Sequence, residues 1–139
     1  VFLKRRSNLT LMNTSGKISF AELVYSLRES ADALTFCNVY SSVFSNGEGE
    51  FPTKQIELIF DFFEDCIENA LPKLSACLVR VTALNGELSC RIVLDNVKTA
   101  VRDGWQKKEC EKLGAKLSVA DSDETLYATL TFGAKEARR

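Results

Sequence analysis

The sequence predicts an α/β protein in two layers, with a mixed sheet covered on one face by about three helices. Segments with apolar residues at the helical period alternate with shorter segments in which apolar and polar residues alternate. Each predicted strand has one polar face, which indicates a sheet covered on one side only. The length of 139 residues, with 45% hydrophobic and 27% charged residues, is that of one globular domain with its own core.

We expect three parts along the chain: a linker at residues 1–17, a folded domain at 18–133 and a tail at 134–139. The linker carries a basic cluster at residues 4–6, which is either a solvated linker or a hinge to a domain upstream. The chain begins at Val1 and not at a methionine. We therefore expect it to be part of a longer protein, and a membrane segment upstream stays open.

The first half of the domain is predicted to contain two helices with a strand between them. The first helix begins at Ser19, because Ser19 and Glu22 form a capping box, and it ends near Asn38. The stretch VYSSVF is β-branched and aromatic, which predicts a strand, and the turn-forming SNGEGE ends it. Pro52 begins the second helix, since its fixed φ suits a first turn, and Pro72 ends it.

The second half is predicted to contain two hairpins with a short helix between them. Asn85-Gly86 separates two apolar stretches and predicts a type I′ turn. The helix runs from Trp105 to Leu113, and Gly114 closes it in the left-handed region. The stretch KLSVADSDETLYATLTF predicts the second hairpin. The residues expected to face the helices are Leu88, Cys90, Ile92 and Leu94 in the first hairpin and Leu126, Ala128, Leu130 and Phe132 in the second.

The second helix carries an acidic stripe on an otherwise apolar surface. At the helical period, one open arc is predicted to hold Asp61, Glu64, Asp65 and Glu68, with Asn69 just beyond it. Like charges three or four residues apart repel by roughly a few tenths of a kcal/mol per pair. The arc must therefore face water, a cation or a basic partner, and both a solvated surface and the wall of a metal site fit the pattern.

The composition excludes several kinds of chemistry. Without any histidine, the chain holds no Ser-His-Asp triad, Cys-His dyad or ordinary zinc site. Five cysteines at apolar positions without a C-x-x-C spacing predict reduced, buried thiols in a cytosolic protein. A net charge of −1 argues against nucleic acid, and every apolar run is shorter than the roughly 18 to 20 residues of a membrane span. Catalysis would depend on carboxylates, amides, backbone groups or a bound ion.

The stretch FPTKQIELIFDFFEDCIENALPKLSACLVRV resembles the nucleotide-binding core of sensor histidine kinases, in the GHKL ATPase superfamily with its Bergerat fold. In that family an LP dipeptide opens a helix, and an acidic or amide residue stands four positions before an Asn. A basic residue or His follows four positions later, and a strand begins after an Ala-containing turn. This chain matches the layout without a gap, with Pro52, Asp65, Asn69, Lys73 and Ala76.

The resemblance implies a role for each matched residue. Asn69 would bind Mg²⁺, Asp65 would position or deprotonate the attacking group, and Lys73 would lie near the phosphates of ATP. Asp95, after the next apolar strand, would accept a hydrogen bond from the adenine amino group. Gly104 would let backbone N–H groups approach a phosphate.

Beyond Asp95 the sequence departs from the family. The family has a glycine-bearing D-x-G-x-G, whereas this chain has DNVKTA and no glycine before Gly104. The lid that covers the nucleotide is reduced to the few residues between Asn96 and Asp103. Residues 97–99 make a poor phosphate cradle, since close wrapping favours positive φ and no Cβ.

The resemblance implies three candidate functions. The first is the ATP-binding catalytic domain of a bacterial two-component sensor histidine kinase, which uses ATP and Mg²⁺ to phosphorylate a His on a dimerisation domain outside this chain. A response regulator would be a further partner, and the full-length protein would be a cytoplasmic or membrane-anchored homodimer whose catalytic domain touches no membrane. The second is a degenerate, pseudokinase-like interaction module that no longer binds nucleotide. A third is an anti-sigma-like kinase with a Ser target.

Overall fold

The structure is a computed structural model that describes residues 16–133. The predicted tail and all but two residues of the predicted linker lie outside the described residues. The elements in chain order are β1 (Lys17–Ser19), α2 (Phe20–Ala33), the 3-10 helix η1 (Leu34–Cys37), β2 (Tyr40–Gly47), β3 (Glu50–Pro52), α3 (Thr53–Ala70), β4 (Ala76–Leu84), β5 (Glu87–Asp95), α4 (Lys107–Leu113), β6 (Ala115–Ser122) and β7 (Thr125–Phe132).

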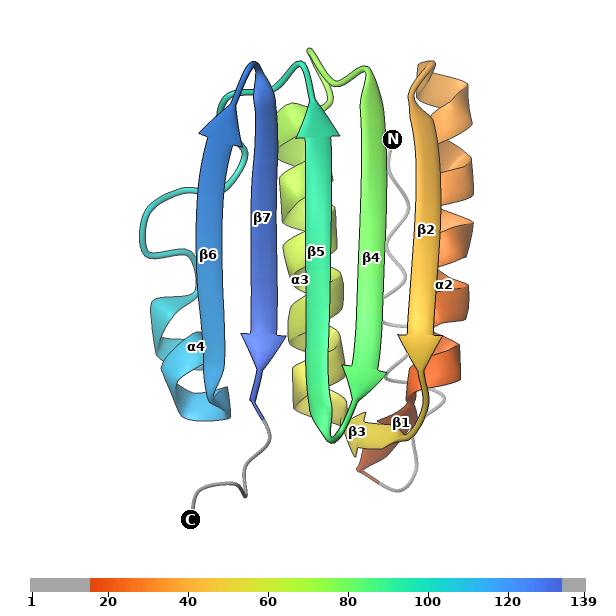
Figure 1. The fold of residues 1–139 in the computed structure, drawn as a ribbon, viewed down its shortest axis with the longest axis vertical. Coiled ribbons are helices and arrows are strands. Elements are labelled where there is room, and N and C mark those ends of the chain that lie inside the picture. The colour runs from red at the N-terminus through yellow and green to blue at the C-terminus, as the bar shows by residue number, and fades with distance from the viewer. Residues whose placement is uncertain (1–15, 134–139) are drawn as a thin grey trace.

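The predicted two-layer α/β sandwich is confirmed. Five strands form one mixed sheet in the order β2-β4-β5-β7-β6, in which β2 pairs parallel to β4 and every other pair is antiparallel. Figure 1 shows α2, α3 and α4 on the same side of this sheet, while the other face carries no helix. The short strands β1 and β3, which were not predicted, pair antiparallel in a small second sheet.

The core lies between the helices and the covered face of the sheet. The predicted inward faces of both hairpins are confirmed, because every second residue of β5 and β7 is buried. Helix α3 contributes most of the opposite wall, with Phe60, Phe62 and Phe63 fully buried. Burying a large apolar side chain stabilises the fold by about 1.5–3 kcal/mol, so this layer fixes where α3 lies on the sheet.

The predicted helix ends follow from local chemistry. Ser19 accepts a hydrogen bond from the backbone N–H of Glu22 at 3.1 Å, so the capping box begins α2. Asn38, with a φ of 63°, ends the helical stretch after η1. Pro52 lies directly before α3, as predicted. Helix α4 begins at Lys107 and not at Trp105, because Gln106 has a φ of 45° and Trp105 turns toward α3.

Candidate functional site

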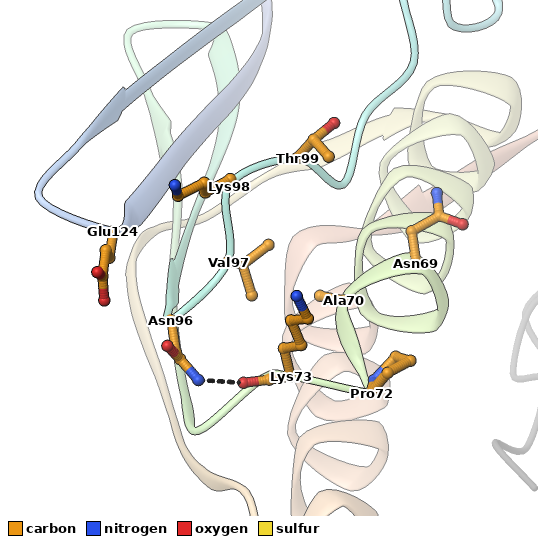
Figure 2. Close-up of a pocket in the computed structure, with 9 residues that line it drawn as sticks. All are labelled: Asn69, Ala70, Pro72, Lys73, Asn96, Val97, Lys98, Thr99 and Glu124. Atoms are coloured by element: carbon orange, nitrogen blue, oxygen red, sulfur yellow. Dashed lines mark hydrogen bonds between the residues drawn. The ribbon is translucent and has the colours of Figure 1, made fainter.

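A cavity of about 520 Å³ lies beside the C-terminal end of α3. Its walls come from the end of α3 and the turn after it, the segment that follows β5, and the turn between β6 and β7 (Figure 2). These segments are far apart in sequence and meet at one end of the sheet. The lining residues are Asn69, Ala70, Pro72, Lys73, Asn96, Val97, Lys98, Thr99 and Glu124.

The lining of this cavity suits an anion. Lys73 and Lys98 line the cavity from two different walls, and Thr99 also lines it. The Lys98 side chain extends toward the β6–β7 turn that carries Glu124 (Figure 2). Glu124 is the one carboxylate among the lining residues, so the cations outnumber it. Asn96 Nδ2 donates a hydrogen bond of 2.8 Å to the Lys73 carbonyl oxygen, and this bond ties the two walls together (Figure 2).

Asn69 lines the cavity and also forms a hydrogen bond with the segment that follows β5. Its Nδ2 donates a hydrogen bond of 2.8 Å to the carbonyl oxygen of Ala100, which is only 4% exposed. The Asn69 amide oxygen makes no hydrogen bond with any other residue of 16–133. An amide oxygen is a ligand that Mg²⁺ accepts, so a metal could bind Asn69 without breaking the bond to Ala100.

Asp65 lies one helical turn before Asn69 and does not line the cavity. Its Oδ2 accepts a hydrogen bond of 2.9 Å from Trp105 Nε1. The Trp105 ring is 3% exposed and packs edge-on against Phe62, with 5.6 Å between ring centroids. The carboxylate that the resemblance makes catalytic therefore has an indole N–H as its partner.

The two hydrogen bonds fasten one segment onto α3. We use the name lid segment for residues 96–106, which lie between β5 and α4. Val97, Ala100 and Trp105 of this segment are all buried, so the lid segment has an apolar side that joins the core. Asp65 and Asn69 hold the lid segment against α3, and the cavity lies at the end of the segment that follows β5.

Asp95 and Gly104 lie outside the cavity. Leu94 is buried against the helices, so the alternation of β5 turns Asp95 to the uncovered face of the sheet. There Asp95 Oδ1 accepts a hydrogen bond of 3.1 Å from Thr125 Oγ1 on β7. Gly104 is exposed in the turn before Trp105, with a φ of 74°. The structure thus brings Asn69 and Lys73 together and leaves Asp65, Asp95 and Gly104 elsewhere.

From the sequence, two residues of the cavity, Asn96 and Glu124, receive no site role, and residues 97–99 are treated only as a poor phosphate cradle. One signal for Asn96 is present, because an Asn directly after a strand tolerates the left-handed region, and Asn96 has a φ of 68°. For Glu124 no signal existed, since its position depends on how the second hairpin packs.

The acidic stripe of α3 is not one open arc. Glu68 is exposed, but Glu64 is only 3% exposed, and Asp61 and Asp65 are half-buried. The prediction of a uniformly open stripe is therefore wrong at Glu64. Among residues 16–133, no three His, Cys, Asp or Glu side chains converge to hold a metal ion. Within the same range, no helix has the length and apolar character needed to cross a membrane.

Most of the thiols lie in the core. Burial raises the pKa of Cys77 and of Cys90 to about 12. Burial raises the pKa of Cys66 as well, with smaller contributions from Cys90, Cys77 and Asp65. The prediction of buried thiols is confirmed for four cysteines, whereas Cys37 is exposed.

The fold is that of the catalytic domains of histidine kinases. The chain superposes on Acinetobacter baumannii histidine kinase AdeS with a TM-score of 0.62 and 13% identity, over 94% of this chain and 73% of the other. For the blue-light activated histidine kinase EL346 of Erythrobacter litoralis, the histidine kinase domain gives 0.60 and 14%, over 89% and 71%. The nucleotide-free catalytic domain of histidine kinase ThkA gives 0.57 and 11%, over 88% and 98%.

These identities establish a shared fold and nothing finer. ThkA has also been solved in complex with the response regulator protein TrrA. No protein-family model matches the sequence. No curated protein matches it either.

Proposed function

We propose that this chain is the ATP-binding catalytic domain of a sensor histidine kinase and that it holds ATP and Mg²⁺ in the cavity beside Asn69. One observation carries the proposal. In a fold shared with histidine kinase catalytic domains, Asn69, Lys73 and Lys98 line one cavity of about 520 Å³.

The residues present fit the proposed ligands. The Asn69 amide oxygen would bind Mg²⁺, which takes oxygen ligands and keeps several waters of its own. Lys73 and Lys98 would offset the negative charge of the phosphates. Bound Mg²⁺ would supply charge neutralisation for phosphoryl transfer. Asp65 would orient the attacking group once Trp105 has moved, and we leave Asp95 out because it lies on the other face of the sheet.

The acceptor of the phosphoryl group must lie outside this chain, because the sequence contains no histidine. We infer a dimerisation domain with the acceptor His, a homodimeric full-length protein and a cytoplasmic site of action. The complex of ThkA with a response regulator supports the proposal of a similar partner here.

A second function, a protein-interaction module without nucleotide, is favoured by a different observation. Asp65 already accepts a hydrogen bond from the lid segment and Asn69 donates one to it, and Val97 and Ala100 of the lid segment are buried. A lid segment that closes on α3 in this way would replace the nucleotide and leave the sandwich as a scaffold.

Titration with Mg-ATP, monitored by calorimetry and thermal unfolding, separates the two functions. At 100 times the Kd, a ligand that binds only the folded chain stabilises it by about 2.7 kcal/mol. We expect Asn69→Ala to lose the Mg²⁺-dependent part of ATP binding. We expect Asn69→Asp to keep it, because a carboxylate oxygen replaces the amide oxygen while the donor to Ala100 is lost.

Asn46→Ala is the matched control, since Asn46 is exposed on β2 and outside the cavity. Its affinity for Mg-ATP should equal that of the parent chain. Absence of any heat or thermal shift at millimolar Mg-ATP would overturn the nucleotide proposal and favour the interaction module.

A further inference from the structure

The face of the sheet opposite the helices carries a concentrated pair of positive charges. Arg80 on β4 and Arg91 on β5 are opposite each other in the antiparallel ladder. Both side chains are exposed, and each arginine stands at the middle of its strand. Figure 1 turns the sheet face without helices toward the viewer. We use the name open face for the side of the sheet that holds these two residues.

The arginine pair is destabilising on its own, because like charges directly opposite each other in a sheet repel. Among residues 16–133 neither guanidinium is paired with a carboxylate. Each instead lies over an aromatic ring of a neighbouring strand. Arg80 is 5.8 Å from the Phe44 ring centroid, and Arg91 is 5.3 Å from that of Tyr127. The rings hold the guanidinium groups close to the sheet.

The next row of the open face is apolar. Leu78 and Val93 are opposite each other, two residues from Arg80 and Arg91 on the same strands, and both are only half-buried. Phe44, 49% exposed, lies in the arginine row, opposite Arg80 on the edge strand β2. The open face therefore places two arginines without a carboxylate partner next to a short apolar row, with Asp95 beyond that row at the end of β5.

We propose that the open face binds an acidic segment of a partner protein, with a carboxylate on Arg80 and Arg91 and an apolar side chain on Leu78 and Val93. A planar guanidinium matches a carboxylate through two parallel hydrogen bonds, so two held guanidinium groups form a receptor for acidic side chains. A bound carboxylate would also offset the repulsion between the two arginines. This site is on the opposite side of the sheet from α3 and does not depend on the nucleotide proposal.

Charge complementarity favours this occupant over two others. A second copy that pairs about a twofold axis through the centre of the open face would place arginine against arginine. Nucleic acid would stack on aromatic rings, but a guanidinium already lies over one face of Phe44 and of Tyr127, and the net charge of the chain is −1.

The test uses a fluorescein-labelled peptide of alternating Glu pairs and single Leu residues, with anisotropy as the readout. We expect the double variant R80E/R91E to bind it about tenfold more weakly or worse. The control K54E/K108E changes the net charge equally at two exposed lysines on α3 and α4 and should bind like the parent. In NMR spectra of the parent chain, the backbone amide resonances that shift when the peptide is added should belong mainly to β4 and β5.

A second variant protects the test against misfolding. The variant R80Q/R91Q removes the repulsion between the two arginines. Its urea midpoint should therefore be at least as high as that of the parent, while its affinity for the acidic peptide should be lower. Equal losses in R80E/R91E and K54E/K108E would overturn the proposal, as would tighter binding of oligothymidine at the same amides. A dimer seen by sedimentation that R80E/R91E dissolves would assign the open face to a second copy.

Discussion

At the residue scale, the polar groups of α3 serve the protein's own lid segment. The spacing of Asp65 and Asn69 correctly indicates that both side chains project from one side of the helix, a turn apart. Their partners, Trp105 and Ala100, follow 40 and 31 residues later in the chain. No local pattern encodes such pairings, because they depend on where the segment after β5 packs.

The bond between Asp65 and Trp105 should contribute measurably to stability. We expect a double-mutant cycle with Asp65→Ala and Trp105→Phe to give a coupling energy of about 1–2 kcal/mol, since the acceptor is charged and half-buried. Urea unfolding followed by circular dichroism measures it. Tyr127→Phe is the control, because it also removes a polar group from an aromatic ring and should change the stability by less than about 0.5 kcal/mol. A coupling energy near zero would contradict the interpretation.

Asp95 illustrates how a resemblance and a physical pattern can disagree. The position after the strand suggested an adenine contact, whereas the alternation of β5, with Leu94 inward, sends Asp95 to the open face. This alternation can be read from the sequence, and it accounts for the side of the sheet on which Asp95 lies. A motif gives the position of a residue along the chain, but the alternation of the strand determines on which face of the sheet its side chain lies.

At the scale of elements, the signals that were strong in the sequence are the ones that the structure reproduces. Capping by Ser19, the prolines around α3 and the Asn85-Gly86 turn, with φ values of 54° and 79°, all act locally. Strands β1 and β3 have three residues each, too few for an alternation to be recognised. Their pairing is created by the tertiary fold.

The end of β2 offers a test of strand packing. Gly47 has a φ of 118°, and a Cβ at this position would collide with the backbone of Ala83 on β4. Gly49 has nearly the same φ, 124°, but its Cβ would meet only the Phe51 ring at 3.6 Å. We expect Gly47→Ala to lose about 1–3 kcal/mol more unfolding free energy than Gly49→Ala. Equal losses in chemical denaturation would show that backbone conformation alone governs both sites.

At the scale of the whole molecule, the layer architecture was predictable and the strand order was not. One polar face per strand is enough to imply a sheet covered on one side. The parallel pairing of β2 with β4 joins strands separated by all of α3, and the order β2-β4-β5-β7-β6 places the last strand in the chain inside the sheet. The parallel pairing and the strand order both depend on how the complete core packs.

The buried thiols make global stability sensitive to alkaline pH. Cys77 and Cys90 have folded pKa values of about 12, whereas an unfolded Cys titrates near about 8.5. Above that lower value the unfolded chain releases protons that the folded chain keeps, so stability falls as the pH rises between about 9 and 12. The urea midpoint at several pH values measures the slope. Cys77→Ala and Cys90→Ala should each flatten it, and an unchanged slope in both variants would contradict this cause.

Trp105 is the single tryptophan of the chain, and it is enclosed between Phe62 and Asp65. Its emission therefore comes from one known place, the seam where the lid segment meets α3. Separation of the lid segment from α3 would transfer the Trp105 indole from a buried to a solvent-exposed environment and shift its emission maximum. The molecule thus carries a built-in optical reporter at the location where its two candidate functions differ.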